Sequence, residues 1–175
     1  AADPKNMEMA NFLGICYCEL GDFQKGLVIF NEIASQDNPK YAEDVVKAKE
    51  NIKLYTNNRI AKLQGENDFD GIIAVADEML AVNPQDALAQ KIRLQALFDK
   101  KDYAGVIASA EEAAAGHTDE EERSDVYFIL GAAYNARTMP QQAIDALSKV
   151  TAGANVAAAQ KTVAQLKENA AKANS

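Results

Sequence analysis

The sequence has 175 residues, of which 48% are hydrophobic and 25% are charged, and this balance is typical of a globular domain with a buried core. Its formal net charge of −8 argues against nucleic acid and anionic membrane surfaces as partners, because both attract basic proteins. No stretch approaches the roughly 18 consecutive apolar residues that can span a bilayer, so membrane insertion is not expected.

The chain begins Ala1-Ala2-Asp3, without a Met and without the charged-then-apolar pattern of a signal peptide. A signal peptide, a tag or a longer N-terminal region could have preceded these residues. We therefore expect a soluble protein. The sequence does not decide its compartment, which is the cytoplasm, or the periplasm if a signal peptide has been removed.

A turn residue followed by an Asp-aromatic pair recurs along the chain. The three copies are Gly21-Asp22-Phe23, Asn67-Asp68-Phe69 and Lys101-Asp102-Tyr103, with a weaker fourth at Thr138-Met139-Pro140. Phe69 follows Phe23 by 46 residues, and Tyr103 follows Phe69 by 34. A period near 34 is typical of helix-pair repeats, because one helix pair cannot bury its apolar face without stacking on another.

The repeats predict one all-α domain over residues 1–175, built from four helix pairs and a C-terminal capping helix. The pairs span residues 5–38, 39–83, 84–117 and 118–153, and the capping helix spans residues 154–173.

The first pair combines a helix over residues 5–20 with a helix over residues 22–36. Gly21 ends the first helix and Asp22 caps the second, whose inward residues include Leu27 and Phe30. The first helix has one apolar face at helical spacing, formed by Met9, Phe12, Leu13, Cys16, Tyr17 and Leu20.

In the second pair, Asn38-Pro39 starts the segment of residues 39–65, and residues 68–82 form the returning helix. No Gly or Pro interrupts the interior of residues 40–64. The sequence leaves open whether this segment is one long helix or two helices joined near Asn57-Asn58.

The third and fourth pairs follow the same plan. Asn83-Pro84 starts a helix over residues 84–99. Residues 102–115 form the antiparallel second helix of this pair, which ends at Gly116. Thr118 and Glu121 have capping-box spacing, which predicts that the first helix of the fourth pair starts at Thr118. The second helix of that pair is expected from Pro140 to Val150. The capping helix places Val156, Ala159, Val163, Leu166 and Ala170 on one side.

The outer pairs resemble the tetratricopeptide repeat. The first pair matches its pattern with Leu13-Gly14, Tyr17, Gly26, Phe30 and Pro39, and the last with Tyr127, Leu130-Gly131, Tyr134, Ala143 and Leu147. The two middle pairs are degenerate. The resemblance implies an α-solenoid, a right-handed superhelix of antiparallel helix pairs, whose first helices line a concave groove that holds a partner peptide or helix.

In such a stack, ten residues would line the groove. The apolar ones are Ile15, Leu54, Leu88, Phe98 and Phe128, and the polar ones are Asn11, Asn57, Lys91, Gln95 and Asn135. The alternative for each residue taken alone is packing against a neighbouring helix. Only Asn11 and Lys91 resemble the clamp with which one branch of the family holds chaperone C-termini, so a chaperone-tail receptor is not expected.

Candidate catalytic and metal-binding residues are sparse. His117 is the one histidine and is expected in a surface loop. Cys16 and Cys18 are expected to be small helix residues, with at least one in the core. The acidic residues 119–122 suit the first turn of a helix better than a metal site. No nucleotide-binding or hydrolase motif occurs, and we expect neither a cofactor nor a metal.

The sequence thus favours a non-catalytic protein-interaction module or assembly scaffold, with a protein or peptide as its partner. The alternative is a homo-oligomeric structural protein, in which residues 39–65 or an exposed end mediate a homodimer. An enzyme is the weakest hypothesis.

Overall fold

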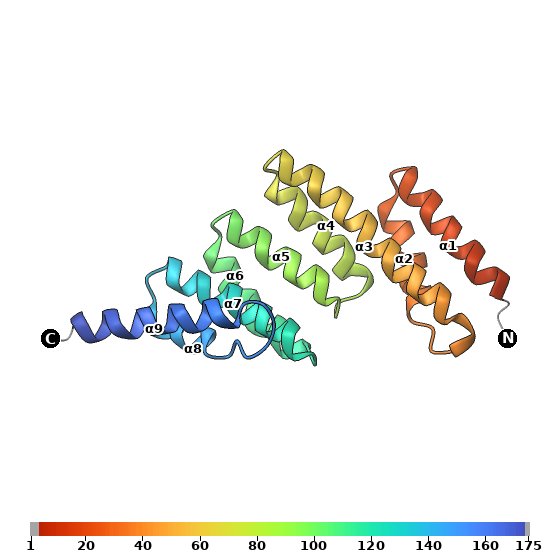
Figure 1. Ribbon diagram of the computed structural model, residues 1–175. Coiled ribbons are helices and arrows are strands. Elements are labelled where there is room, and N and C mark those ends of the chain that lie inside the picture. The colour runs from red at the N-terminus through yellow and green to blue at the C-terminus, as the bar shows by residue number, and fades with distance from the viewer. Residues whose placement is uncertain (1–3, 174–175) are drawn as a thin grey trace. The chain divides into compact units, whose positions relative to one another are not determined.

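The computed structural model describes residues 4–173, and these form nine α-helices, one short 3₁₀ turn and no strand (Figure 1). The all-α prediction is confirmed. The chain divides into two compact units, the first ending at Pro84 and the second beginning at Gln85. Within the described residues, no helix is both long and apolar enough to cross a membrane.

The first unit holds four α-helices whose neighbours pack on one another. They are α1 (Pro4–Glu19), α2 (Phe23–Ala34), α3 (Ala42–Gly65), which follows the turn η1 (Pro39–Tyr41), and α4 (Phe69–Val82). In addition to its neighbours in sequence, α1 contacts α3, and α2 contacts α4. The core side chains come mainly from α2 and α4, including Leu27, Phe30, Val75 and Met79.

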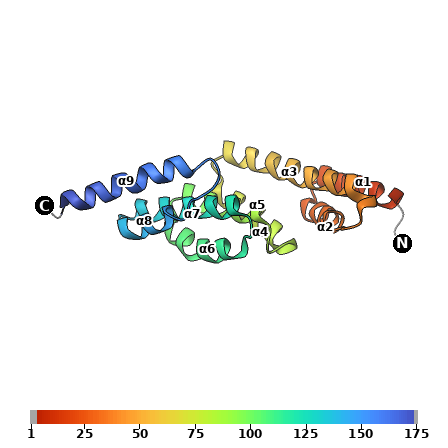
Figure 2. The same cartoon turned by 60° about the horizontal axis from the view of Figure 1, so that its bottom comes forward.

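The second unit holds five α-helices (Figure 2). They are α5 (Ala87–Asp99), α6 (Tyr103–Gly116), α7 (Glu120–Ala136), α8 (Pro140–Leu147) and α9 (Val156–Ala173). Each packs on the next, and α5 also contacts α7. Leu94, Val106, Val126 and Leu130 are among the fully buried side chains of this unit.

The recurrent motif has the same local structure in each copy. The turn residues have a left-handed backbone, with φ of 87° at Gly21, 54° at Asn67, 66° at Lys101 and 55° at Thr138. In the three stronger copies the next residue is an Asp whose carboxylate accepts a backbone N–H three residues on, at 2.8–3.2 Å. The fourth copy has Met139 there, without a side-chain cap, and Pro140 opens α8. The predicted cap at Asp22 is confirmed, and Asp68 and Asp102 cap their helices in the same way.

A close glycine contact joins the helices of both outer pairs. A Cβ built on Gly14 of α1 would lie 2.5 Å from a ring carbon of Phe30 on α2. A Cβ on Gly131 of α7 would lie 2.5 Å from Cγ of Leu147 on α8. The Leu-Gly positions are therefore places where a large side chain of the returning helix packs directly on the backbone of the first.

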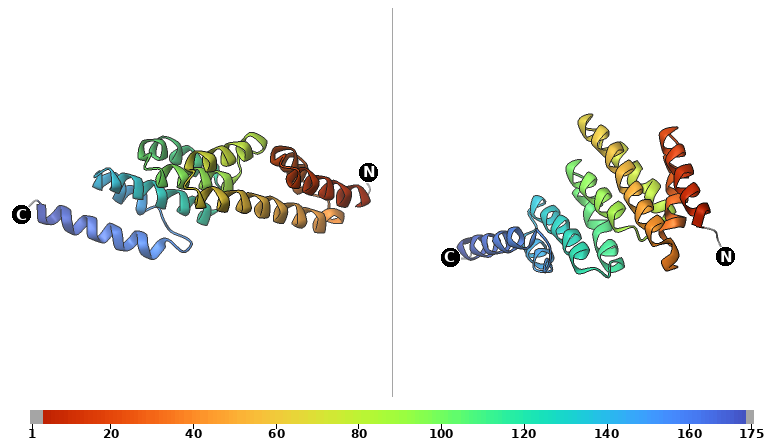
Figure 3. Two further views of the ribbon diagram at one scale, coloured as in Figure 1. Left: turned by 90° about the horizontal axis from the view of Figure 1, so that it is seen from above. Right: turned by 45° about the vertical axis from the view of Figure 1, so that its right-hand side comes forward.

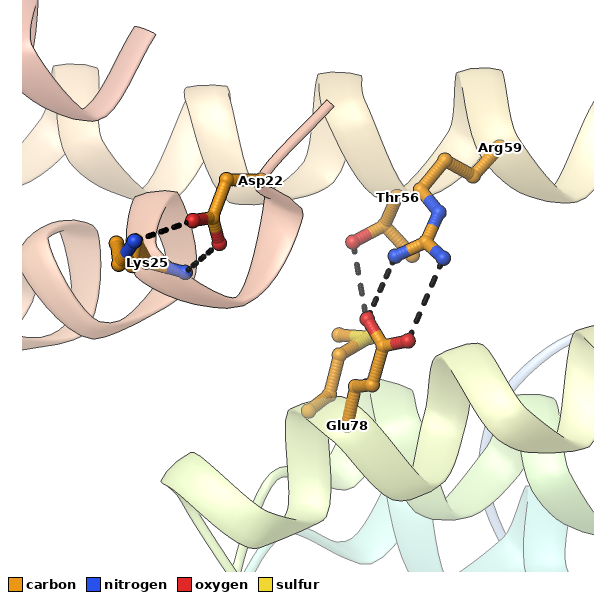
Figure 4. A network of polar contacts seen from close by, with 6 residues as sticks. Asp22, Lys25, Thr56, Arg59 and Glu78 are labelled. Carbon is orange, nitrogen blue, oxygen red and sulfur yellow. Dashed lines mark hydrogen bonds and ion pairs between the residues drawn. The ribbon is translucent and has the colours of Figure 1, made fainter. Parts of the chain in front are cut away.

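Residues 42–65 form a single helix, so the alternative of two helices joined at Asn57-Asn58 is excluded. Arg59 fastens α3 to α4 through two contacts with the Glu78 carboxylate, at 2.7 and 3.4 Å (Figure 4). Its guanidinium also lies 4.4 Å from the ring centre of Phe23 on α2. One arginine thus connects three helices of the first unit.

Two predicted helix starts are wrong by one to three residues. α5 begins at Ala87 rather than Pro84, because Pro84 lies in a turn and the Asp86 carboxylate caps the helix through Ala89 N–H at 2.9 Å. α7 is capped by Asp119 rather than Thr118, because the Asp119 carboxylate accepts the Glu122 N–H at 2.9 Å.

Candidate functional site

A row of exposed apolar side chains runs along α1. The exposed fraction is 69% for Met9, 60% for Phe12, 50% for Leu13 and 82% for Leu20, which follows the end of the helix, and Cys16 between them is exposed as well. Residues three and four apart are neighbours on a helix surface, so these five form one continuous strip. We call them the α1 stripe.

The α1 stripe lies on a different face of α1 from the one that packs in the unit. The buried residues of α1 are Asn11 and Gly14, and Gly14 meets Phe30 of α2. Within the first unit, α1 lies at one edge, with the other helices of the unit on the same side of it (Figure 1, and Figure 3 at right). The periodicity of residues 5–20 correctly identified an apolar face, but no element of the described chain covers most of it.

A groove next to the α1 stripe lies between α1 and α3. Its volume is about 250 Å³, and its lining comprises Glu8, Asn11, Phe12, Ile15, Asp44, Lys47, Glu50 and Asn51. Phe12 belongs both to the α1 stripe and to this α1–α3 groove. The two features therefore form one continuous surface of the first unit.

Asn11 is the buried polar residue of the α1–α3 groove, with an exposed fraction of 5%. Its Nδ2 donates a hydrogen bond of 3.2 Å to the backbone carbonyl of Asp44, which ties α1 to the start of α3. Its Oδ1 is buried and has no hydrogen-bond partner. Because a carbonyl can only accept, the amide nitrogen must face Asp44, so Oδ1 is the acceptor left over.

The charges of the α1–α3 groove are mainly negative. Three carboxylates line it, those of Glu8, Asp44 and Glu50, against the single ammonium of Lys47. Lys47 is already paired with Glu43 at 2.9 Å, and that bond raises the pKa of Lys47. The groove therefore has an uncompensated negative charge.

The four groove residues predicted on the first unit fall into two groups. Asn11 and Ile15 lie together in the α1–α3 groove. Leu54, 52% exposed, and Asn57 lie on the solvent side of α3 and do not line this groove.

Six of the predicted groove residues lie in the second unit, and the side chains of four of them contact other residues of that unit. Lys91 pairs with Asp125 of α7, and Gln95 donates to Asp99 at 2.9 Å. The ring of Phe98 meets Tyr103 edge-on at 5.3 Å, and Phe128 packs on the cluster of Leu147, Val150 and Ala159. Leu88 and Asn135 are exposed.

A second groove, of about 520 Å³, lies between α8 and α9. Apolar side chains such as Val150, Val156 and Val163 make up much of its wall, and Lys167 stands at its edge. None of the residues predicted to bind a partner lines it.

The prediction that His117 lies in a surface loop is wrong. His117 does lie in the connection that follows α6, but it is only 6% exposed, so it is not on the surface. Its Nδ1 lies 3.5 Å from Glu122 Oε2, and its backbone carbonyl accepts from Arg123 at 3.4 Å. The neighbouring acidic residues occupy the first turn of α7, where the helix dipole favours them.

Neither cysteine is fully buried, so the prediction that one lies in the core is also wrong. Cys16 is exposed and Cys18 is half-buried, with its Sγ 2.3 Å from the position that a Cβ on Gly26 would take. Burial and then the nearby Glu19 carboxylate raise the pKa of Cys18 to about 11. Among the described residues, no three His, Cys, Asp or Glu side chains come together as metal ligands would.

No protein-family profile matches the chain, and no curated protein matches it either. Membership of the tetratricopeptide-repeat family is therefore a proposal.

Proposed function

We propose that this chain is a non-catalytic protein-interaction module of the tetratricopeptide-repeat type, an α-solenoid that binds a partner polypeptide. Three features support the repeat assignment: the recurrent turn with its Asp cap, the Gly–large contacts in both outer pairs, and the contacts of α1 with α3 and of α2 with α4.

The α1 stripe is the observation that carries the binding function. Four of its side chains are 50–82% exposed, and the five form one row along one side of α1 and the residue that follows it. A continuous row of exposed apolar side chains is unfavourable in water, and such patches often mark interaction surfaces. We place the partner on this stripe and on the α1–α3 groove that Phe12 shares with it.

The test is affinity capture from a lysate of the source organism with a Leu13→Glu/Leu20→Glu variant. The matched control is Val28→Glu/Val46→Glu, which changes two apolar residues of the same unit that are 40% and 54% exposed. Circular dichroism verifies that both variants keep their helices. We expect a partner that the intact protein and the control capture and that the stripe variant loses. Equal capture by all three proteins would contradict the proposal.

Self-association is the second candidate, and the same stripe favours it. A helix face with regular apolar spacing can pack against a second copy of itself in an isologous dimer. Sedimentation of the purified protein over a range of concentrations separates the two functions. A mass that rises with concentration in the intact protein and in the control, but not in the stripe variant, would establish the homodimer.

A further inference from the structure

The α1–α3 groove has the chemistry of a site for a cationic side chain. Its carboxylates come from both walls, Glu8 from α1 and Asp44 and Glu50 from α3. The one ammonium in the lining, Lys47, is held by Glu43, which stands outside the groove. A positively charged group that enters the groove would meet attraction from both helices.

The buried Oδ1 of Asn11 is an independent sign of a ligand. An acceptor that is buried without a donor costs roughly 1–3 kcal/mol, so such atoms are rare unless something else satisfies them. Asn11 lines the groove and is 95% buried, while its Nδ2 is already engaged with Asp44. Oδ1 is covered in the free protein, so a ligand N–H that bonds to it has to displace the atoms that cover it, and the bond would then remove the penalty.

The remaining wall of the groove is apolar. Phe12 exposes 60% of its surface and Ile15 is half-buried beside it. An aromatic face can stack on a guanidinium and can also pack against an apolar residue. The volume of about 250 Å³ lies a little below the roughly 300–1,000 Å³ of small-molecule sites and suits one or two side chains.

Building on the protein-binding function proposed above, we propose that the α1–α3 groove binds an arginine side chain of the partner, next to an apolar residue that packs on Phe12. Arginine fits better than lysine because its planar group carries five donors. It can reach an amide oxygen and a carboxylate at the same time and stack on a ring. A lysine ammonium is a compact, strongly hydrated point charge, so it lacks the planar face that could stack on Phe12.

The test is a nuclear magnetic resonance titration of the full chain with N-acetyl-arginyl-leucine amide. Its control is the citrulline analogue, which keeps the shape of arginine and removes the charge. We expect resonances of residues 8–15 and 44–51 to shift, with binding at least about tenfold tighter than for the citrulline analogue. Affinity should fall with added salt, because the carboxylates are partly exposed. A second titration uses N-acetyl-lysyl-leucine amide, which should bind more weakly, and equal binding of this lysine peptide would overturn the assignment to arginine.

A pair of variants checks the location of the site. Glu8→Gln/Glu50→Gln should weaken binding by about tenfold, whereas Glu111→Gln/Glu112→Gln, which changes two exposed carboxylates of α6, should leave it unchanged. Absence of shifts, equal binding of the citrulline analogue, or unaltered binding to the groove variant would overturn the arginine site. The protein-binding function would still stand if the Leu13→Glu/Leu20→Glu variant, which leaves the groove lining intact, lost the captured partner.

Discussion

The hydroxyl of Tyr55 on α3 donates a hydrogen bond of 2.7 Å to Oε1 of Glu19, the last residue of α1. The two residues are 36 positions apart in the sequence. The bond joins the end of α1 to the middle of α3, while the bond from Asn11 to Asp44 joins the two helices nearer the start of α3. Together they hold both walls of the α1–α3 groove.

We expect the Tyr55–Glu19 bond to show in the titration of the tyrosines. The bond, and after it burial, raises the pKa of Tyr55 from 10.0 to about 12. Because the folded protein favours the protonated phenol, the stabilisation is fully present below pH 10.0 and is lost as pH rises through about 12. The tyrosinate absorbance of the intact protein minus that of Tyr55→Phe should therefore titrate near 12. Glu19→Gln should bring that titration closer to 10.0, and a difference already centred there in the intact protein would contradict the prediction.

Gly14→Ala should destabilise the first unit by roughly 1–3 kcal/mol, since the added methyl group would overlap the Phe30 ring at 2.5 Å. Urea denaturation measures the change. Phe30→Leu in the Gly14→Ala background should cost less than the two single changes added together, because the smaller side chain makes room. Gly65→Ala is the matched control, since a Cβ there has nothing within 4 Å, and it should cause no loss. Strict additivity at Gly14 and Phe30 would argue against the clash.

Ser124→Ala should loosen the loop that leads into α9. The buried Ser124 Oγ accepts two backbone N–H groups, those of Thr151 and Ala152, each at 3.1 Å. Losing both bonds should cost about 1–2 kcal/mol and should speed hydrogen exchange in residues 151–165. The control is Ser35→Ala, because Ser35 follows α2 and its exposed hydroxyl donates to the backbone carbonyl of Glu32 three residues earlier. Unchanged exchange in the Ser124→Ala protein would show that the loop is held by other contacts.

The two cysteines should differ in reactivity towards a maleimide at neutral pH. Cys16 is exposed, whereas Cys18 is half-buried and has a pKa of about 11, which leaves little of the reactive thiolate. In single variants followed by intact mass, Cys18→Ser should be labelled at least about tenfold faster than Cys16→Ser. Unfolding in urea should bring the two rates together. Equal labelling rates of Cys16 and Cys18 in the folded protein would contradict this prediction.

Part of the candidate site was accessible from the sequence. The expected groove included Asn11 and Ile15, and both line the α1–α3 groove. The helical spacing of the apolar residues in α1 predicted that they share one face of the helix. That spacing does not show whether another helix covers the face. Lys91 and Phe128 were expected to face a partner, yet they contact Asp125 and the Leu147 cluster, residues 19 to 34 positions away that no local pattern could pair with them.

The sequence by itself determined that the chain is helical and where Asp22 caps a helix, because a cap is made between residues two or three positions apart and depends on little else. Asp68 and Asp102 make the same local cap, whereas the helices expected to start at Pro84 and Thr118 are capped by Asp86 and Asp119. Only the tertiary structure decided that α3 is continuous, that His117 is buried and that α1 turns Gly14 and Asn11 inward while Leu13 stays in water. These outcomes depend on which helix approaches which face, and close packing across tens of residues sets that approach.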